Sequence, residues 1–180
     1  MKRSLLALLL LAAAGRAAPA QGTEDLDRRI VRAVNMYYDG KRDEAKREFN
    51  ALVDIYNRQG RDLNGRQTAA VAVALSYLGK DEPQVFKDAL TVYDRAIEAD
   101  PSNLETRVKL AELFLDKYNG AEAKKTLAEV FSRNADYVPA LVLEARRRDF
   151  DNEPGADSVL ARALEKEPEN VRGRDRKSVV

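Results

Sequence analysis

The side chains that could support catalysis in this chain are serines, carboxylates and tyrosines, because its 180 residues include no histidine and no cysteine. Histidine is the commonest general base, and cysteine supplies thiol nucleophiles and thiolate metal ligands. The sequence pattern pairs no base with the serines of the central region, which are Ser76, Ser102, Ser132 and Ser158. It also contains no Gly-rich phosphate loop. The sequence therefore predicts no catalytic site.

A short acidic stretch, DNEPGAD at residues 151–157, comes nearest to a metal-binding loop. A calcium loop places oxygen ligands at alternate positions and closes with a glutamate, and this stretch has neither feature. It is typical of a turn followed by residues that cap a helix. The sequence thus predicts neither a metal ion nor a cofactor.

The charge balance argues against nucleic acid as a partner. The whole chain has a formal charge of +1, but residues 1–20 and 175–180 together carry five basic side chains and one acidic side chain. The chain between them has a formal charge of −3, whereas nucleic-acid binding calls for basic patches. The densest basic run, RRR at residues 146–148, is interpreted as a solvated helix face.

The first twenty residues have the layout of a secretory signal peptide. Lys2 and Arg3 precede an apolar run, Leu5–Ala14, and small residues lead to a predicted cleavage site after Ala20. The alternative is a membrane anchor, but a spanning helix needs about 20 apolar residues, and this run of ten followed by Arg16 is too short. The sequence predicts export to a periplasm or the cell exterior, with no membrane span in the mature chain and a short linker at residues 21–24.

The last six residues depart from the pattern before them. The segment Asp175–Val180 can be back-translated as GATCGGAAGAGCGTCGTG, which is the start of a common sequencing adapter. One hypothesis is that the reading frame ran from a short DNA fragment into adapter, so that the natural protein continues past about Arg172. The alternative is a genuine polar tail. Residues 171–180 are expected to be disordered.

Hydrophobic periodicity predicts helices through the rest of the chain, whose composition of 9 glycines and 6 prolines is that of a helical protein. Around the turn signal YNG, apolar residues recur at helical spacing on both sides. The first group is Leu110, Ala111 and Phe114, and the second is Ala123, Leu127 and Val130. Two helices joined by so short a turn must pack antiparallel, as a helical hairpin.

Three further segments follow the same plan. In the second helix of each predicted hairpin an alanine is followed, four and seven positions later, by residues that also face the core. These triplets are Ala45, Phe49, Leu52; Ala89, Tyr93, Ala96; Ala123, Leu127, Val130; and Ala156, Leu160, Ala163. Pro101 and Pro168 end two of these helices, because proline cannot continue a helix. The four units, at about residues 25–59, 64–101, 102–135 and 136–168, are expected to stack around a continuous core.

Alanine-spaced helix pairs of about 34 residues with a closing proline resemble tetratricopeptide repeats. The resemblance covers residues 25–170 and implies an all-α fold, an α-solenoid of about eight helices in antiparallel hairpins. The usual tryptophan is absent, and the first helices carry Ala33, Ala74, Ala111 and Ala145 in place of the usual glycine. With the signal-peptide layout, the resemblance suggests an exported bacterial protein of this family.

In such repeats the first helix of each pair lines a concave surface. The resemblance implies that this surface binds a partner protein or peptide, and the residues expected on it are Ile30, Val34, Tyr37, Val71, Leu75, Leu78, Val108, Glu112, Leu115 and Arg146. Its N-terminal part is apolar and suits a peptide with hydrophobic anchors. The alternative is that many of these side chains only pack against neighbouring helices.

The paired tyrosines of MYYDG, residues 36–40, have two interpretations. One is an aromatic platform for a ligand. The other, which the pattern favours, is that Tyr37 packs inside the hairpin while Tyr38 is half exposed with its hydroxyl in water.

The predicted function is a non-catalytic scaffold for protein–protein interaction. Two alternatives stay open. The repeats could belong to a larger exported enzyme, with a metallopeptidase-like domain beyond the end of this chain. They could instead form a self-associating assembly component, because no polar capping helix follows the fourth unit and apolar surface would be exposed there.

Overall fold

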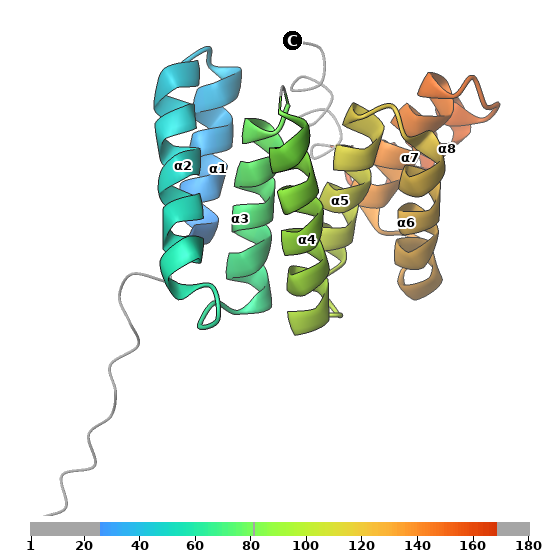
Figure 1. Cartoon of the computed structure of the whole chain (residues 1–180). Helices are drawn as coiled ribbons and strands as arrows, with labels where there is room; N and C mark the ends of the chain where they lie inside the picture. The colour runs from blue at the N-terminus through green and yellow to red at the C-terminus, as the bar shows by residue number, and fades with distance from the viewer. Residues whose placement is uncertain (1–25, 81, 169–180) are drawn as a thin grey trace, which may run out of the picture.

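The computed structural model describes residues 26–80 and 82–168, and every element in these ranges is a helix. The predicted all-α fold with about eight helices is confirmed (Figure 1). The predicted signal peptide, the linker and the C-terminal tail lie outside the described residues. The helices are α1 (Leu26–Tyr38), α2 (Arg42–Gln59), α3 (Gly65–Leu78), α4 (Pro83–Ala99), α5 (Leu104–Asp116), α6 (Gly120–Arg133), α7 (Val138–Phe150) and α8 (Ala156–Lys166).

The helices form four hairpins that stack into two layers (Figure 1). Within the hairpins, α1 packs on α2, α3 on α4, α5 on α6 and α7 on α8. The odd-numbered helices also contact one another in order, and α2, α4 and α6 each pack against the odd-numbered helix that follows. This arrangement is a helical-repeat solenoid. The surface of the odd-numbered layer that is turned away from α2, α4 and α6 is termed the inner face below.

The predicted triplets of the second helices account for the close packing within the hairpins. In α2, α4 and α6, each of the nine triplet residues has at most 2% of its surface exposed. Small alanines allow the helices to approach closely, and the larger side chains fill the space between them. In α8, Ala163 is fully buried but Ala156 and Leu160 are half buried. This helix is the last one described, and it packs mainly on α7.

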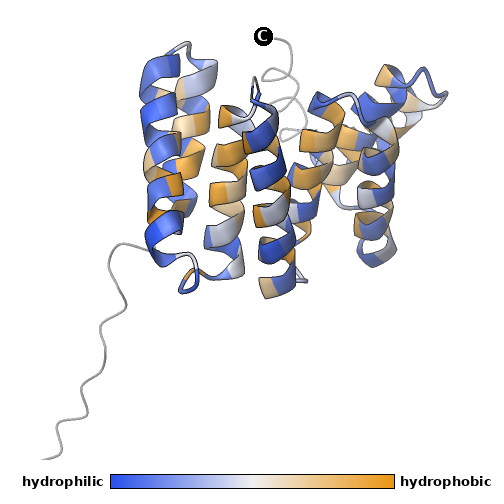
Figure 2. Cartoon of the chain, viewed as in Figure 1, coloured by the Kyte–Doolittle hydropathy of each residue, from blue (hydrophilic) through white to orange (hydrophobic). Residues whose placement is uncertain are grey.

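The core runs along the stack as three connected clusters. The first joins α1–α4 and reaches α5, the second joins α5, α6 and α7, and the third joins α7 and α8. Phe114 packs against the first and second clusters, and Phe131 packs against the second and third. Figure 2 shows hydrophobic residues where helices face each other and hydrophilic residues on the outward sides. Each hairpin therefore needs its neighbours to bury its apolar surface.

Side chains at the helix ends explain several helix boundaries. α3 begins with a capping box, in which the side chains of Asn64 and Gln67 each accept a hydrogen bond of 3.0 Å from the backbone N–H of the other. At the start of α5, the side chain of Asn103 accepts a hydrogen bond from the backbone N–H of Thr106. α4 ends two residues before Pro101, and α8 ends two residues before Pro168. A local sequence signal therefore determines each of these ends.

The turn between α5 and α6 differs from the interpretation that placed its turn signal at Gly120. The residue with a positive φ, 59°, is Tyr118, and Gly120 is the first residue of α6. The turns after α1 and α7 use Gly40 and Asn152 in the same conformation, with φ of 81° and 52°. Residues other than glycine and asparagine adopt this left-handed region at a cost, so the backbone of Tyr118 is strained.

Candidate partner-binding site

The structure places the ten predicted partner-binding residues on the odd-numbered helices but buries half of them in the core. The buried residues are Ile30, Val71, Leu75, Val108 and Leu115; Val34, Tyr37, Leu78 and Glu112 are partly buried, and Arg146 is exposed. The buried five fill the first and second core clusters and leave no surface for a partner. Partner binding by the ten stays a prediction, and the accessible side chains are the ones able to contribute to it.

Three tyrosines from α1 and α3, Tyr37, Tyr38 and Tyr77, form an aromatic group that we call the tyrosine cluster. Tyr37 and Tyr77 meet edge to face with ring centroids 4.9 Å apart, and the ring of Tyr77 stacks on Phe49 at 5.0 Å. The hydroxyl of Tyr77 donates a hydrogen bond of 3.3 Å to that of Tyr38. The Tyr38 hydroxyl, which we expected to contact only water, is therefore bound within the protein.

Two cations lie against the tyrosine cluster. The ammonium of Lys80 is 4.7 Å from the ring centroid of Tyr37 and 5.0 Å from that of Tyr77. The guanidinium carbon of Arg42 is 5.3 Å from the Tyr37 centroid. These separations are within the range of cation–π attraction. Sequence reasoning missed both contacts. Lys80 and Tyr37 are far apart in the chain, and Arg42 reaches the Tyr37 ring across the turn between α1 and α2.

Beyond the cluster, α5 and α7 carry a network of charged residues. Arg146 of α7 donates a hydrogen bond of 2.9 Å to Asp116 and lies 3.9 Å from a carboxylate oxygen of Glu112, both on α5. Lys109 donates a bond of 2.8 Å to the same Glu112. Glu112 and Arg146, two of the predicted site residues, are thus joined in one network. The C-terminal half of the inner face therefore carries charged side chains.

The hydroxyls of Tyr77 and Tyr93 stay protonated. Burial raises the pKa of Tyr77 well above its ordinary value, and the bond with Tyr38 and the charges of Glu112 and Asp116 raise it further. Burial also raises the pKa of Tyr93, whose hydroxyl is hydrogen-bonded with a serine of α3. At neutral pH these groups therefore act as hydrogen-bonding groups and not as bases.

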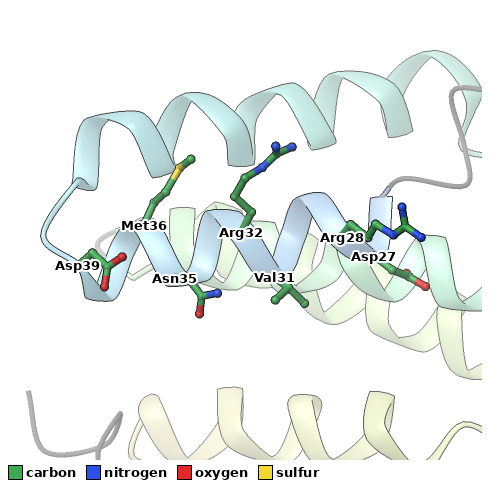
Figure 3. A pocket seen from close by; sticks show the side chains of 7 residues that line it. All are labelled: Asp27, Arg28, Val31, Arg32, Asn35, Met36 and Asp39. Carbon is green, nitrogen blue, oxygen red and sulfur yellow. The ribbon is translucent and has the colours of Figure 1, made fainter.

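A shallow hollow of about 470 Å³ runs along one side of α1, and sequence reasoning did not predict it (Figure 3). Val31 has 60% of its surface exposed there. In Figure 3, Arg32 and Met36 extend toward α2, while Val31 and Asn35 point away from it. The residues that line the hollow are Asp27, Arg28, Val31, Arg32, Asn35, Met36 and Asp39.

The interpretation of RRR as a solvated face is wrong for its middle residue. Arg147 is fully buried, whereas Arg146 is exposed and Arg148 is half buried. The Arg147 guanidinium donates hydrogen bonds to Glu144, Asp151 and Glu153. It thereby ties the acidic turn after α7 to the helix itself. The sequence did contain a signal for this burial, which is the acidic turn DNEPG that follows the three arginines. A buried cation requires anionic partners, and this turn supplies them.

The described residues hold no other site with recognisable chemistry. Across residues 26–80 and 82–168, no group of three or more carboxylates is placed to hold a metal ion. Ser76, Ser102 and Ser132 donate their hydroxyl protons to nearby oxygen atoms. In the same ranges no helix combines the length and apolar character needed to cross a membrane.

The fold and the inner face define the class of protein, which is an α-solenoid built from helical hairpins. Residues 85–146, which run from α4 into α7, match the family model of the tetratricopeptide repeat, and this match supports the tetratricopeptide-repeat family. Comparison with curated proteins and with solved structures gives no match. Tetratricopeptide repeats generally mediate protein–protein interaction and are typically non-catalytic.

Proposed function

We propose that this chain is a non-catalytic scaffold that binds a partner protein or peptide on its inner face. The observation that carries the proposal is the adjacency of two partly accessible surfaces on the odd-numbered helices. One is the tyrosine cluster of α1 and α3, and the other is the charged network of α5 and α7. Aromatic and arginine side chains are enriched among the residues that dominate interface energies.

The packing favours binding without a large rearrangement. Both surfaces stand on helices that share one connected core, so their relative positions are set before a partner arrives. Preorganised surfaces bind more tightly because less conformational entropy is lost on association. An extended segment that crosses α1, α3, α5 and α7 would contact the tyrosine cluster at one end and Arg146 at the other.

The test is selection of peptides from a displayed library on the purified chain, followed by calorimetric titration of the selected peptides. We expect Arg146→Glu to weaken their binding about tenfold or more, because it reverses a charge on the inner face. The matched control is Lys125→Glu on α6, an exposed residue of the other layer. Equal losses in both variants, or none in either, would count against the inner face as the site.

Self-association is a second candidate function, favoured by the exposure of Val31 in the hollow on α1. An exposed apolar side chain in a hollow on one side of the first described helix is a surface that a second copy could cover. Sedimentation velocity over a range of concentrations measures this directly. We expect mass to rise with concentration and Val31→Glu to abolish the rise; a constant monomer mass would exclude self-association at this surface.

We further propose that the protein is exported, which rests on the signal-peptide layout of residues 1–20. N-terminal sequencing of the protein recovered from expressing bacterial cells tests this proposal. Cleavage before Gln21 is the expected result, and a mature protein that retains Met1 would contradict it.

A further inference from the structure

The ammonium group of Lys80 occupies an aromatic site. Its Nζ lies over two rings, 4.7 Å from the centroid of Tyr37 and 5.0 Å from that of Tyr77. The ring of Tyr38 is perpendicular to both, with centroids 5.7 and 6.3 Å away. Cations bind ring faces within about 6 Å, and aromatic cages recognise ammonium ligands in this way. The tyrosine cluster thus has the geometry of an ammonium site, filled by a side chain of the same molecule.

The rings are held by the core, whereas the Lys80 side chain is not. Tyr77 stacks on Phe49, which is buried. Lys80 lies beyond the end of α3, it is exposed, and its ammonium has no carboxylate partner among the described residues. Lys117 fixes the backbone there by donating hydrogen bonds of 2.9 and 2.7 Å to the carbonyls of Gly79 and Lys80. The Lys80 side chain can therefore leave the site by rotation about its own bonds while the site keeps its shape.

The surroundings favour a positive charge. Glu112 and Asp116 of α5 lie close enough to act on the Tyr77 hydroxyl. A cation in the site therefore meets two ring faces and the negative potential of these carboxylates. Three cations offset this potential in part, namely Arg146 and Lys109 beside the carboxylates and Arg42 beside Tyr37. An anionic side chain would meet the negative faces of the rings and the same carboxylates.

We propose that the tyrosine cluster is the subsite for a lysine or arginine side chain of the partner peptide, and that Lys80 is an internal occupant which this side chain displaces. The proposal rests on the proposed function of the inner face and adds the chemical class of the anchor residue. A cationic anchor differs from the sequence-based expectation, which was a peptide with hydrophobic anchors at the N-terminal part of the inner face. If the proposal holds, Lys80 competes with the partner's side chain for the site and weakens its binding.

The first experiment uses tetramethylammonium chloride as the probe, with tert-butanol as the uncharged probe of the same shape. The chain is labelled with ¹³C in its tyrosine rings, and ring signals are followed by NMR during titration. We expect tetramethylammonium to shift the signals of Tyr37 and Tyr77 saturably, and tert-butanol to leave them unchanged. In Lys80→Gln the affinity should rise about two- to fivefold, which is the worth of one exposed cation–π contact.

Lys87→Gln is the matched control, since Lys87 is an exposed lysine on α4, in the other layer. It should bind tetramethylammonium as the unaltered chain does. The proposal is overturned if Lys80→Gln shows no saturable shift at Tyr37 and Tyr77, or if both probes shift these signals equally. Unchanged circular dichroism in both variants shows that the fold is kept.

A second experiment separates this proposal from the proposed function. Each peptide selected on the inner face is resynthesised with its lysines or arginines replaced one at a time by norleucine. Loss of binding at one position, with tighter binding of the parent peptide to Lys80→Gln, is expected. Peptides that bind the inner face equally well without any cation would overturn the subsite and leave the scaffold function standing. Tetramethylammonium binding without any peptide binding would support the subsite and count against the scaffold.

Discussion

The guanidinium of Arg147 is fully buried and forms two parallel hydrogen bonds, of 2.8 and 2.9 Å, with the carboxylate of Glu144 one helical turn away. The same guanidinium donates two further hydrogen bonds, of 2.7 and 3.0 Å, to the carboxylate of Glu153. Bidentate charge-assisted bonds are the strong class of hydrogen bond, and they hold both groups in one geometry. This cation organises the turn between α7 and α8.

Replacing Arg147 by Met should destabilise the chain by about 3 kcal/mol, because Glu144 would stay buried after losing its main partner. The free energy of unfolding from urea titration measures the effect. The double variant with Glu144→Met should recover most of the loss, since an apolar pair avoids the desolvation of both charges. Arg146→Met is the matched control on the exposed neighbour and should change stability by less than about 1 kcal/mol. If Arg147→Met also lowered the free energy of unfolding by less than about 1 kcal/mol, the buried pair of Arg147 and Glu144 would be dispensable for stability.

Acid should weaken the same turn. Hydrogen bonds from Arg147 and Lys124 lower the pKa of Glu153 from its ordinary 4.5 to about 2. Because the folded-state pKa is depressed, the stabilisation is complete above about pH 4.5 and is lost as the pH falls toward 2. Urea midpoints measured from pH 6 to pH 2.5 should therefore fall, and Glu153→Gln should flatten the decline in this window. A decline of the same steepness in the variant would mean that other carboxylates are responsible.

Replacing Tyr118 should reveal the strain in its turn. Its φ of 59° suits glycine, and its side chain is 82% exposed. We expect Tyr118→Gly to be more stable than Tyr118→Ala by about 1 kcal/mol, because both lose the ring contact with Phe150 but only glycine relieves the backbone. Thermal unfolding of the two variants gives the comparison. Equal stabilities would show that the turn relaxes around any side chain.

Adding one methyl group at Gly120 should be destabilising, although alanine is the better helix former. The new Cβ would lie 2.5 Å from both carboxylate oxygens of Asp151, which Arg147 holds in place. Gly120→Ala should cost about 1–2 kcal/mol through this clash. In an Asp151→Ala background the same change should be neutral or stabilising, which a double-mutant cycle of unfolding free energies can establish. Additive effects of the two changes would mean that Asp151 moves aside freely.

Some features of this fold follow from short-range signals. The triplets of α2, α4 and α6 could be read from the sequence because residues four and seven positions apart share one face of a helix. The ends of α4 and α8 before Pro101 and Pro168 could be read because proline cannot continue a helix beyond its first turn. These are properties of the local chain, so a linear pattern contains them.

The candidate site was predicted less well. The odd-numbered helices were identified, but Val71 and Leu75 proved to be core residues and Val34 proved to be partly accessible. Apolar periodicity shows that a face is buried, yet it does not show which part of that face meets the next hairpin. The contacts of Lys80 with Tyr37 and Tyr77 depend on how α1 and α3 are set against each other.

The sequence by itself determined that this protein is a stack of helical hairpins, because helix periodicity, small residues and turn signals act over a few residues. The tertiary structure alone decided that Arg147 is buried, that Tyr118 and not Gly120 takes the left-handed conformation, and that Lys80 fills the tyrosine cluster. The physical reason is the same in each case. Burial and partner choice are set by helices that meet across the stack, and the relative position of those helices is a property of the packed core.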